Sequence, residues 1–414
     1  MPRVSMASAS PETAPQGLAA WVPAGVAGFV CALVGITSSY ALVVEAARAM
    51  DLGPAGLATL SSALLFAIGI TCLLPSLLLR IPVVIAWSTP GAALLAVSLK
   101  GVPLAEALGA FVVCGLLLTL VGVTGWFERQ MARIPVALAS ALLAGVLLRF
   151  GLEAFASVQT APVIVGAMLS VFLLARRWLP RWAVPLTLLA GLMAWPLAQS
   201  TQALQALEGL QQGLGQNWPD PAPLAWPVRF SASAVLGVAV PLFIVTMASQ
   251  NLPGVAVLRA HGYTQAPVSA LITVTGLVTA LLAPFGVFAI NLAAITAALC
   301  MSPEIHPDPA RRWTAAAAAG VLYLVASVFA APLSGLFLAM PRELVITIAG
   351  LALLPTIGRG LAGALEQEPV RDAALVTFLV TASGLQLAGV GSAFWAVVAG
   401  LTCHALWSVR GGQR

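Results

Sequence analysis

The sequence predicts an all-α polytopic membrane protein with 14 transmembrane segments in two inverted sets of seven, in which the third and tenth segments each join a short strand to a half-helix. Hydrophobic residues make up 60% of the 414 residues and charged residues only 8%, whereas a soluble domain carries about 25% charged residues. The apolar runs are continuous rather than alternating, unlike the strands of a membrane barrel. These observations exclude a soluble globular enzyme, a disordered protein and a disulfide-stapled secreted domain.

Each predicted segment is an apolar run bounded by proline, glycine or charge, and most approach the ~20 residues that a spanning helix needs. In the first half the segments cover residues 20–50, 55–79, 81–99, 104–127, 134–155, 161–174 and 184–197. In the second half they cover residues 232–258, 267–285, 287–300, 315–340, 343–365, 373–390 and 394–409. The polar residues 1–18 are predicted to form a disordered cytoplasmic tail, and the Gln-rich residues 200–229 an extracytoplasmic linker between the halves.

The basic residues test this count, because cytoplasmic loops carry an excess of Lys and Arg. With the N-terminus in the cytoplasm, 14 of the 19 Lys and Arg residues fall on the cytoplasmic side, four fall outside, and Arg149 lies within a segment. Both termini are therefore predicted to be cytoplasmic. The basic residues form no cluster interleaved with aromatic residues, so no nucleic-acid partner is expected.

The two broken segments are predicted to contain extended chain followed by a half-helix. Residues 81–87 are rich in β-branched side chains around a proline, and Ser88 or Thr89 then supplies a helix N-cap. In the second half, residues 284–289 are the predicted extended part, and Asn291 lies near the helix start, where it can act as a cap. Two half-helix N-termini that face each other would attract an anion without an arginine.

The two halves also resemble each other as repeats. Residues 88–96 can be laid over residues 290–298. Because seven segments is an odd number, the second half enters the membrane from the opposite side. Inverted repeats with interrupted segments at matching positions indicate the substrate site of a secondary transporter.

The predicted substrate pocket combines neutral hydrogen-bonding groups with flat aromatic walls, a combination that suits a small aromatic carboxylate. An alternative for any single polar residue is a hydrogen bond to its own backbone or to a neighbouring helix. The predicted substrate-binding residues are Ser38, Ser39, Tyr40, Trp87, Ser88, Thr89, Gly91, Ser249, Gln250, Asn251, Phe288, Ile290 and Asn291.

Ionisable residues inside membrane segments are functional candidates. Glu45 is the candidate for proton coupling, and the alternative is a boundary ion pair with Arg48. Arg149 and Glu153, four residues apart, are predicted to form a structural pair. The sequence contains no Walker A or HExxH motif and no nucleophile or metal constellation, so neither a catalytic site, a metal nor a cofactor is expected.

Four stretches resemble the signature sequences of the BenE-type benzoate:proton symporters, namely residues 86–96, 245–259, 291–298 and 303–312. They are spread over both halves of the chain. The resemblance implies a fold similar to that of the nucleobase, ascorbate and sulfate/bicarbonate transporters. In related nucleobase transporters the eighth and tenth segments carry acidic residues. Neutral residues stand at the corresponding positions here, which leaves Glu45, or the carboxylic acid itself, to carry a proton.

The resemblance further implies a division into two domains that move against each other like an elevator. A core domain would comprise residues 19–127 and 230–340, and a gate domain residues 134–199 and 343–410. It also implies a homodimer formed through the gate domain.

The sequence thus predicts a secondary transporter in a bacterial inner membrane that imports benzoate or a related aromatic carboxylate with a proton. One alternative keeps the fold and carries a nucleobase or an inorganic anion. A second is a passive anion channel. An intramembrane enzyme is disfavoured because no catalytic constellation is found.

Overall fold

A computed structural model of the chain describes residues 22–125, 136–179, 182–198, 225–301, 305–306, 308–385, 387 and 392–411. The predicted tail 1–18 and most of the predicted linker 200–229 lie outside these ranges. Within the described residues, six helices are long and apolar enough to cross a membrane, or seven if one bent pair counts as a single span. The structure is therefore that of a helical membrane protein, while the count of 14 spans stays a prediction.

Helical structure occupies each of the predicted segments. In the first half the elements are α1 (Val22–Ala49), α2 (Pro54–Leu79), β1 (Ile85–Trp87), α3 (Thr89–Ser98), α4 (Leu104–Thr124), α6 (Val136–Ala156), α7 (Pro162–Trp178) and α8 (Ala183–Ala198). In the second half they are α10 (Ala232–Ala234), η3 (Val235–Ala239), α11 (Val240–Thr246), η4 (Met247–Asn251), α12 (Leu252–Ala260), α13 (Val268–Leu282), η5 (Ala283–Phe285), β2 (Ile290–Leu292), α14 (Ile295–Met301), η6 (Pro309–Arg311), α15 (Trp313–Val328), α16 (Ala330–Ala339), α17 (Arg342–Leu365), η7 (Glu368–Val370), α18 (Arg371–Ala382) and α19 (Ser392–Gly411).

Prolines explain why two of the segments predicted to be continuous are irregular. The segment from α10 to α12 contains two π-helical turns, η3 and η4, which precede Pro241 and Pro253. A proline lacks an N–H and collides with the carbonyl four residues earlier, so the turn before it widens. Helices α15 and α16 meet at an angle of 70° just before Pro332, which cannot donate to the carbonyl of Val328.

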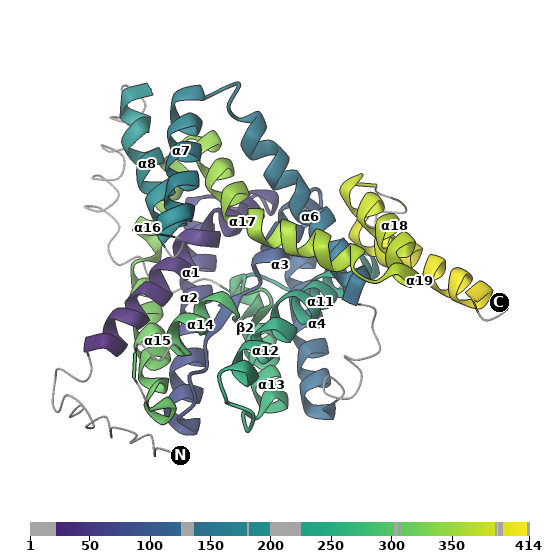
Figure 1. Cartoon of the computed structure of the whole chain (residues 1–414), viewed down its shortest axis with the longest axis horizontal. Helices are drawn as coiled ribbons and strands as arrows, with labels where there is room; N and C mark the ends of the chain where they lie inside the picture. Colours follow the sequence, from purple (N-terminus) through teal and green to yellow (C-terminus); the bar gives the residue numbers. More distant parts are fainter. Residues whose placement is uncertain are drawn as a thin grey trace, which may run out of the picture.

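The helices pack in two groups (Figure 1). Helix α2 packs along α15, α4 along α13, and α1 against both α15 and α3. In the second group α6 and α17 pack along each other, with the pair α7 and α8 at one end and the pair α18 and α19 at the other. The two groups contact each other through α3 with α6 and through α1 with both α17 and α8.

Glycine pairs allow two helix crossings of the first group to be very close. A Cβ atom on Gly69 of α2 would lie 2.9 Å from the carbonyl oxygen of Gly320 in α15. A Cβ atom on Gly115 of α4 would lie 2.8 Å from the carbonyl oxygen of Gly276 in α13. At both crossings backbone meets backbone, the packing that small residues permit between membrane helices.

The two broken segments meet as a two-stranded antiparallel sheet. Strands β1 and β2 pair Ile85 with Leu292, Ala86 with Asn291 and Trp87 with Ile290. Because the strands are antiparallel, α3 begins at one end of the sheet and α14 at the other. The predicted joining of a strand to a half-helix is confirmed for both segments.

The details of the second broken segment differ from the prediction. Residues 283–285 form a 3-10 turn that ends at Gly286 with φ of 87°, and the strand begins only at Ile290. The predicted alignment of residues 88–96 with residues 290–298 is therefore wrong by three positions. When β1 is superposed on β2, Ser88 corresponds to Ala293 rather than to Ile290. A left-handed glycine and a proline-containing turn shorten the extended part in a way that composition does not reveal.

Candidate functional site

Ser88 organises the start of α3. Its Oγ atom accepts a hydrogen bond of 3.1 Å from the backbone N–H of Gly91, so Ser88 rather than Thr89 is the N-cap. The same oxygen accepts a hydrogen bond of 2.9 Å from the Thr246 hydroxyl, which lies at the end of α11. Gly91 is needed beside this cap, since a Cβ atom there would lie 2.7 Å from both Ser88 Oγ and a Leu242 methyl group. The hydrogen bond between Ser88 and Thr246 thus connects the start of α3 to the second half of the chain.

Asn251 holds strand β2 in the same way. Its Oδ1 atom accepts a hydrogen bond of 3.0 Å from the backbone N–H of Leu292, and its Nδ2 atom lies 3.3 Å from the sulfur of Met247. Asn251 is fully buried, whereas its neighbours Ser249 and Gln250 on the same π-helical turn are half-buried. The turn therefore uses one polar side chain for structure and leaves two others partly accessible.

Asn291 is the residue of the sheet whose side chain has a buried polar atom without a hydrogen-bond partner among the described residues. It lies in the centre of β2, fully buried, and its Nδ2 atom donates to the carbonyl of Ala289 at 3.3 Å. Its Oδ1 atom has no partner among the described residues. A buried acceptor without a partner costs about 1–3 kcal/mol, so such an atom indicates a place for a ligand or a water molecule. The predicted capping role is wrong, because Asn291 precedes α14 by four residues and sits in the strand.

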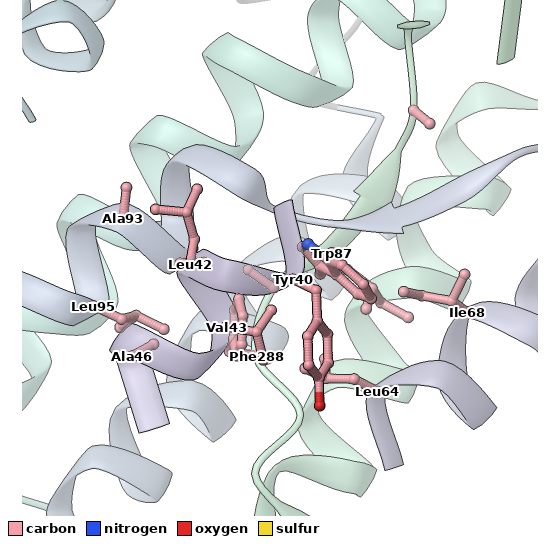
Figure 2. Packing of buried hydrophobic residues seen from close by; sticks show 14 of the residues in the cluster. Tyr40, Leu42, Val43, Ala46, Leu64, Ile68, Trp87, Ala93, Leu95 and Phe288 are labelled. Atoms are coloured by element: carbon pink, nitrogen blue, oxygen red, sulfur yellow. The ribbon is translucent and has the colours of Figure 1, made fainter. Parts of the chain in front are cut away.

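Aromatic rings flank the sheet (Figure 2). The indole Nε1 of Trp87 donates to Ser39 Oγ at 2.9 Å, and the Trp87 ring lies 6.3 Å from that of Tyr40. The Tyr40 hydroxyl bonds to two serine hydroxyls, Ser61 at 2.6 Å and Ser334 at 2.8 Å. Tyr40 can therefore offer only its ring to a substrate, since its hydroxyl is already occupied.

The remaining predicted residues divide between the sheet and its surroundings. Phe288 is fully buried, with its ring 6.0 Å from that of Phe111. The backbone N–H of Ile290 donates to Thr279 Oγ1 at 3.2 Å. Thr89 is half-buried beside the α3 start, and the side chain of Ser38 lies outside the described part of the structure.

Four residues that hold the site through hydrogen bonds are missing from the sequence-based set. Cys72 and Ser76 bond to the backbone of Ile85 and Val83, and the other two are Thr246 and Thr279. Thr246 precedes Ser249 by three residues, the spacing that places two side chains on one helix face, and this spacing is the signal that identifies it. Thr279 has no such signal, because its contact with Ile290 depends on how the chain returns after Gly286.

The immediate surroundings of the sheet are uncharged. Among the described residues, the side chains that hydrogen-bond to the backbone of residues 83–92 and 289–293 are those of serine, threonine, cysteine and asparagine. No carboxylate or guanidinium is among them. The start of α3 lies next to the sheet and carries the partial positive charge of a helix N-terminus. Helix α14 has only seven residues, so its helix dipole is weaker than that of α3.

Glu45 lies away from the sheet, in a cavity of about 360 Å³ at the ends of α1 and α3. Its Oε1 atom is 2.6 Å from a guanidinium nitrogen of Arg48, so the predicted boundary ion pair is present. Arg149 and Glu153 line the same cavity, and their ion pair of 2.8 Å is also confirmed. The structure therefore separates the predicted residues into a neutral group at the sheet and a charged group at the cavity.

This fold and site define a class of protein, the helical membrane transporters in which two interrupted segments meet near the middle of the molecule. The family model described as benzoate membrane transport protein (BenE) matches residues 19–406. The chain therefore belongs to the BenE benzoate membrane transport family, and it is a membrane transporter rather than an enzyme.

Individual relatives agree with this assignment. The chain is 46% identical to the inner membrane protein YdcO of Escherichia coli (strain K12), covering 92% of this chain and 95% of that protein. It is 32% identical to the benzoate membrane transport protein of Acinetobacter baylyi, covering 92% of this chain and 94% of that protein.

Solved structures share the fold, among them two that match most of this chain. The structure of SLC26A9 matches with a TM-score of 0.52 at 13% identity, covering 93% of this chain and 65% of that chain. The transmembrane domain of the cyanobacterial bicarbonate transporter BicA matches with a TM-score of 0.50 at 16% identity, covering 89% of this chain and 97% of that domain. At these identities the likeness concerns the fold.

Proposed function

We propose that this protein imports benzoate or a related aromatic carboxylate together with a proton, by alternating access across a bacterial inner membrane. The observation that carries the proposal is the uncharged, aromatic-flanked sheet in which Asn291 Oδ1 is a buried acceptor with no partner among the described residues. Family membership supports the substrate class, because one relative is named a benzoate membrane transport protein.

The Asn291 Oδ1 acceptor suggests how a proton could cross the membrane with the substrate. A carboxylate has no hydrogen to donate, whereas the protonated acid donates one O–H. Asn291 Oδ1 suits the protonated acid, and a neutral substrate also avoids the cost of bringing a charge into an uncharged pocket. In this version the proton crosses on the substrate. In the other version Glu45 carries it, with Arg48 as its partner in one protonation state.

The binding site would comprise the sheet, the start of α3 and the half-buried polar residues of η4. Trp87 and the Tyr40 ring provide flat apolar surface, as does Phe288 on the other segment. Ser249 and Gln250 provide neutral hydrogen bonds. Ser88 and Asn251 act by positioning the half-helix and the strand rather than through free polar atoms.

The arrangement of the helices supports two inverted halves of seven segments each. If α2 corresponds to α13 and α4 to α15, the contact of α2 with α15 has its equivalent in that of α13 with α4. The contact of α1 with α14 has its equivalent in that of α11 with α3. The glycine crossings obey the same relation, since Gly69 and Gly320 correspond to Gly276 and Gly115.

The two groups of helices support a core domain of residues 19–127 and 230–340 and a gate domain of residues 134–199 and 343–410. We propose that these domains move against each other, that the protein dimerises through the gate, and that both termini are cytoplasmic. The excess of arginine in the predicted cytoplasmic loops supports this orientation.

Uptake of labelled benzoate into proteoliposomes, with and without an inward proton gradient, tests the function. Accumulation above equilibrium that depends on the gradient is the expected result, with protein-free liposomes as the control. Equilibration without accumulation would instead indicate a channel or uniporter. Absence of specific uptake would contradict the substrate assignment and direct the assay to nucleobases and inorganic anions.

A further inference from the structure

A second cavity adjoins the one that contains Glu45. The first, of about 360 Å³, lies between the ends of α1 and α3 and the helices α6 and α17. The second, of about 240 Å³, lies between α3, α6 and the ends of α18 and α19. Both are lined by Val97 of α3 and Arg149 of α6. The two cavities therefore flank the contact between α3 and α6, one of the contacts at which the two groups of helices meet.

The larger cavity has an excess of positive charge. Four basic and three acidic side chains line it. Two of each are used in the ion pairs of Glu45 with Arg48 and of Arg149 with Glu153. Lys100, Arg342 and Asp51 remain, and none of the three forms an ion pair with another described residue. The two cations Lys100 and Arg342 exceed the one carboxylate of Asp51 by one positive charge, which one further anionic group would neutralise.

The same cavity has an apolar wall. Phe150, whose side chain is 5% exposed, lines it together with Val97, Ala96 and Ala49. Small-molecule sites are concave, largely apolar, have volumes of roughly 300–1,000 Å³ and hold a few placed polar groups. A cavity lined by two cations without an ion-pair partner among the described residues and by an aromatic ring matches a ligand with one carboxylate and one aromatic ring.

We propose that this cavity is a separate binding site for the aromatic carboxylate, at which Lys100 and Arg342 bind the carboxylate before the substrate enters between α3 and α6. The proposal rests on the proposed function for the identity of its ligand. It explains how a transporter with an uncharged central site can collect an anion from dilute solution, since clustered cations raise the local concentration of an anionic substrate.

Lys100 provides a direct test, because it is the only lysine in the sequence. The full-length protein in lipid nanodiscs is treated with an amine-reactive reagent, and the modified fraction of Lys100 is measured by mass spectrometry. Benzoate is expected to slow the modification in a saturable manner. Benzamide, the neutral analogue, and chloride at equal ionic strength are expected to leave the rate unchanged. Equal effects of benzoate, benzamide and chloride would overturn the proposal.

A variant pair on one helix tests the role of Arg342. Arg342→Gln is expected to raise the benzoate concentration for half-protection by about fivefold, the upper range for an exposed ion pair. Arg359→Gln removes the same charge from the same helix, at an exposed position away from the cavity, and is expected to leave half-protection unchanged. If the benzoate concentration for half-protection of Lys100 is the same in both variants, Arg342 is excluded from the site.

Uptake by the same purified protein, reconstituted into proteoliposomes, separates this proposal from the proposed function. Benzoate uptake without protection of Lys100 would overturn the cavity site and leave the transport function standing. Protection without uptake would support the cavity site and contradict the transport function.

Discussion

The hydroxyl of Thr246 donates a hydrogen bond of 2.9 Å to the Oγ atom of Ser88, although the two residues are 158 positions apart in the sequence. Ser88 is also the N-cap of α3, so one oxygen both starts a half-helix and ties it to the opposite half of the protein. Any change in Ser88 therefore affects the half-helix and the second half of the chain together.

Ser88→Ala is expected to lower the free energy of unfolding by about 1–3 kcal/mol. It removes an N-cap and leaves the buried Thr246 hydroxyl without its acceptor. Thermal unfolding of the detergent-purified protein measures the effect. Ser170→Ala deletes an exposed hydroxyl that bonds only within α7, and it should leave the stability nearly unchanged. A similar loss for both variants would contradict the role of Ser88.

Asn251→Leu is expected to lower the stability of the protein, whereas Asn291→Leu is expected to weaken benzoate binding. Asn251→Leu leaves the buried N–H of Leu292 unpaired and should cost about 1–3 kcal/mol of stability. Asn291→Leu removes an acceptor that has no partner, and the Ala289 carbonyl keeps its bond of 2.9 Å from the Ser88 N–H. This variant should fold normally and bind benzoate more weakly.

Binding to the purified protein, measured by calorimetry alongside the thermal unfolding, distinguishes the two asparagines. Unchanged benzoate affinity in Asn291→Leu would remove Asn291 from the substrate site. An unchanged unfolding temperature in Asn251→Leu would show that its bond to β2 contributes nothing to stability.

Glu45→Gln tests the origin of proton coupling. If Glu45 carries the proton, the variant loses accumulation driven by an acidic exterior but retains exchange of benzoate across the membrane. If the proton travels on the substrate, gradient-driven accumulation persists. Glu153→Gln is the matched control, because Glu153 lines the same cavity and also pairs with an arginine. Normal gradient-driven uptake by Glu45→Gln excludes Glu45 from coupling.

Gly115→Val is expected to destabilise the protein by about 1–3 kcal/mol or more, since a side chain there meets the backbone of α13 at 2.5–2.9 Å. The backbone of a packed helix pair cannot move aside without separating α4 from α13. Gly166→Ala in α7 is the control, because no atom lies within 4 Å of a Cβ atom there. Thermal unfolding that is equal in the two variants would refute the close crossing.

The sequence predicts the helical segments well because each depends on a local run of apolar residues. The Ser88 cap and the extended chain before it are also local, because β-branched residues, a capping hydroxyl and Pro90 follow one another within the same short stretch. The two ion pairs are likewise local, since their members are three and four residues apart on one helix.

Other features depend on contacts between distant parts of the chain. The sequence assigns Asn291 to a helix start, whereas the structure places it in strand β2, because the strand begins only after Gly286. It groups Ser249, Gln250 and Asn251 as equivalent, whereas only Asn251 among them bonds to β2. The 70° bend between α15 and α16 is signalled by Pro332, but its angle is not.

The sequence by itself determined that the chain lies in a membrane, where its helices run and which two segments are interrupted, because hydropathy and local capping act over a few neighbouring residues. Only the tertiary structure decided which polar side chains of the site have hydrogen-bond partners, and that Asn291 Oδ1 has none among the described residues. That choice depends on the pairing of the two interrupted segments, Ala86 against Asn291, and on the contact of α11 with the first of them, Thr246 against Ser88. No local pattern encodes the partner of a buried polar atom.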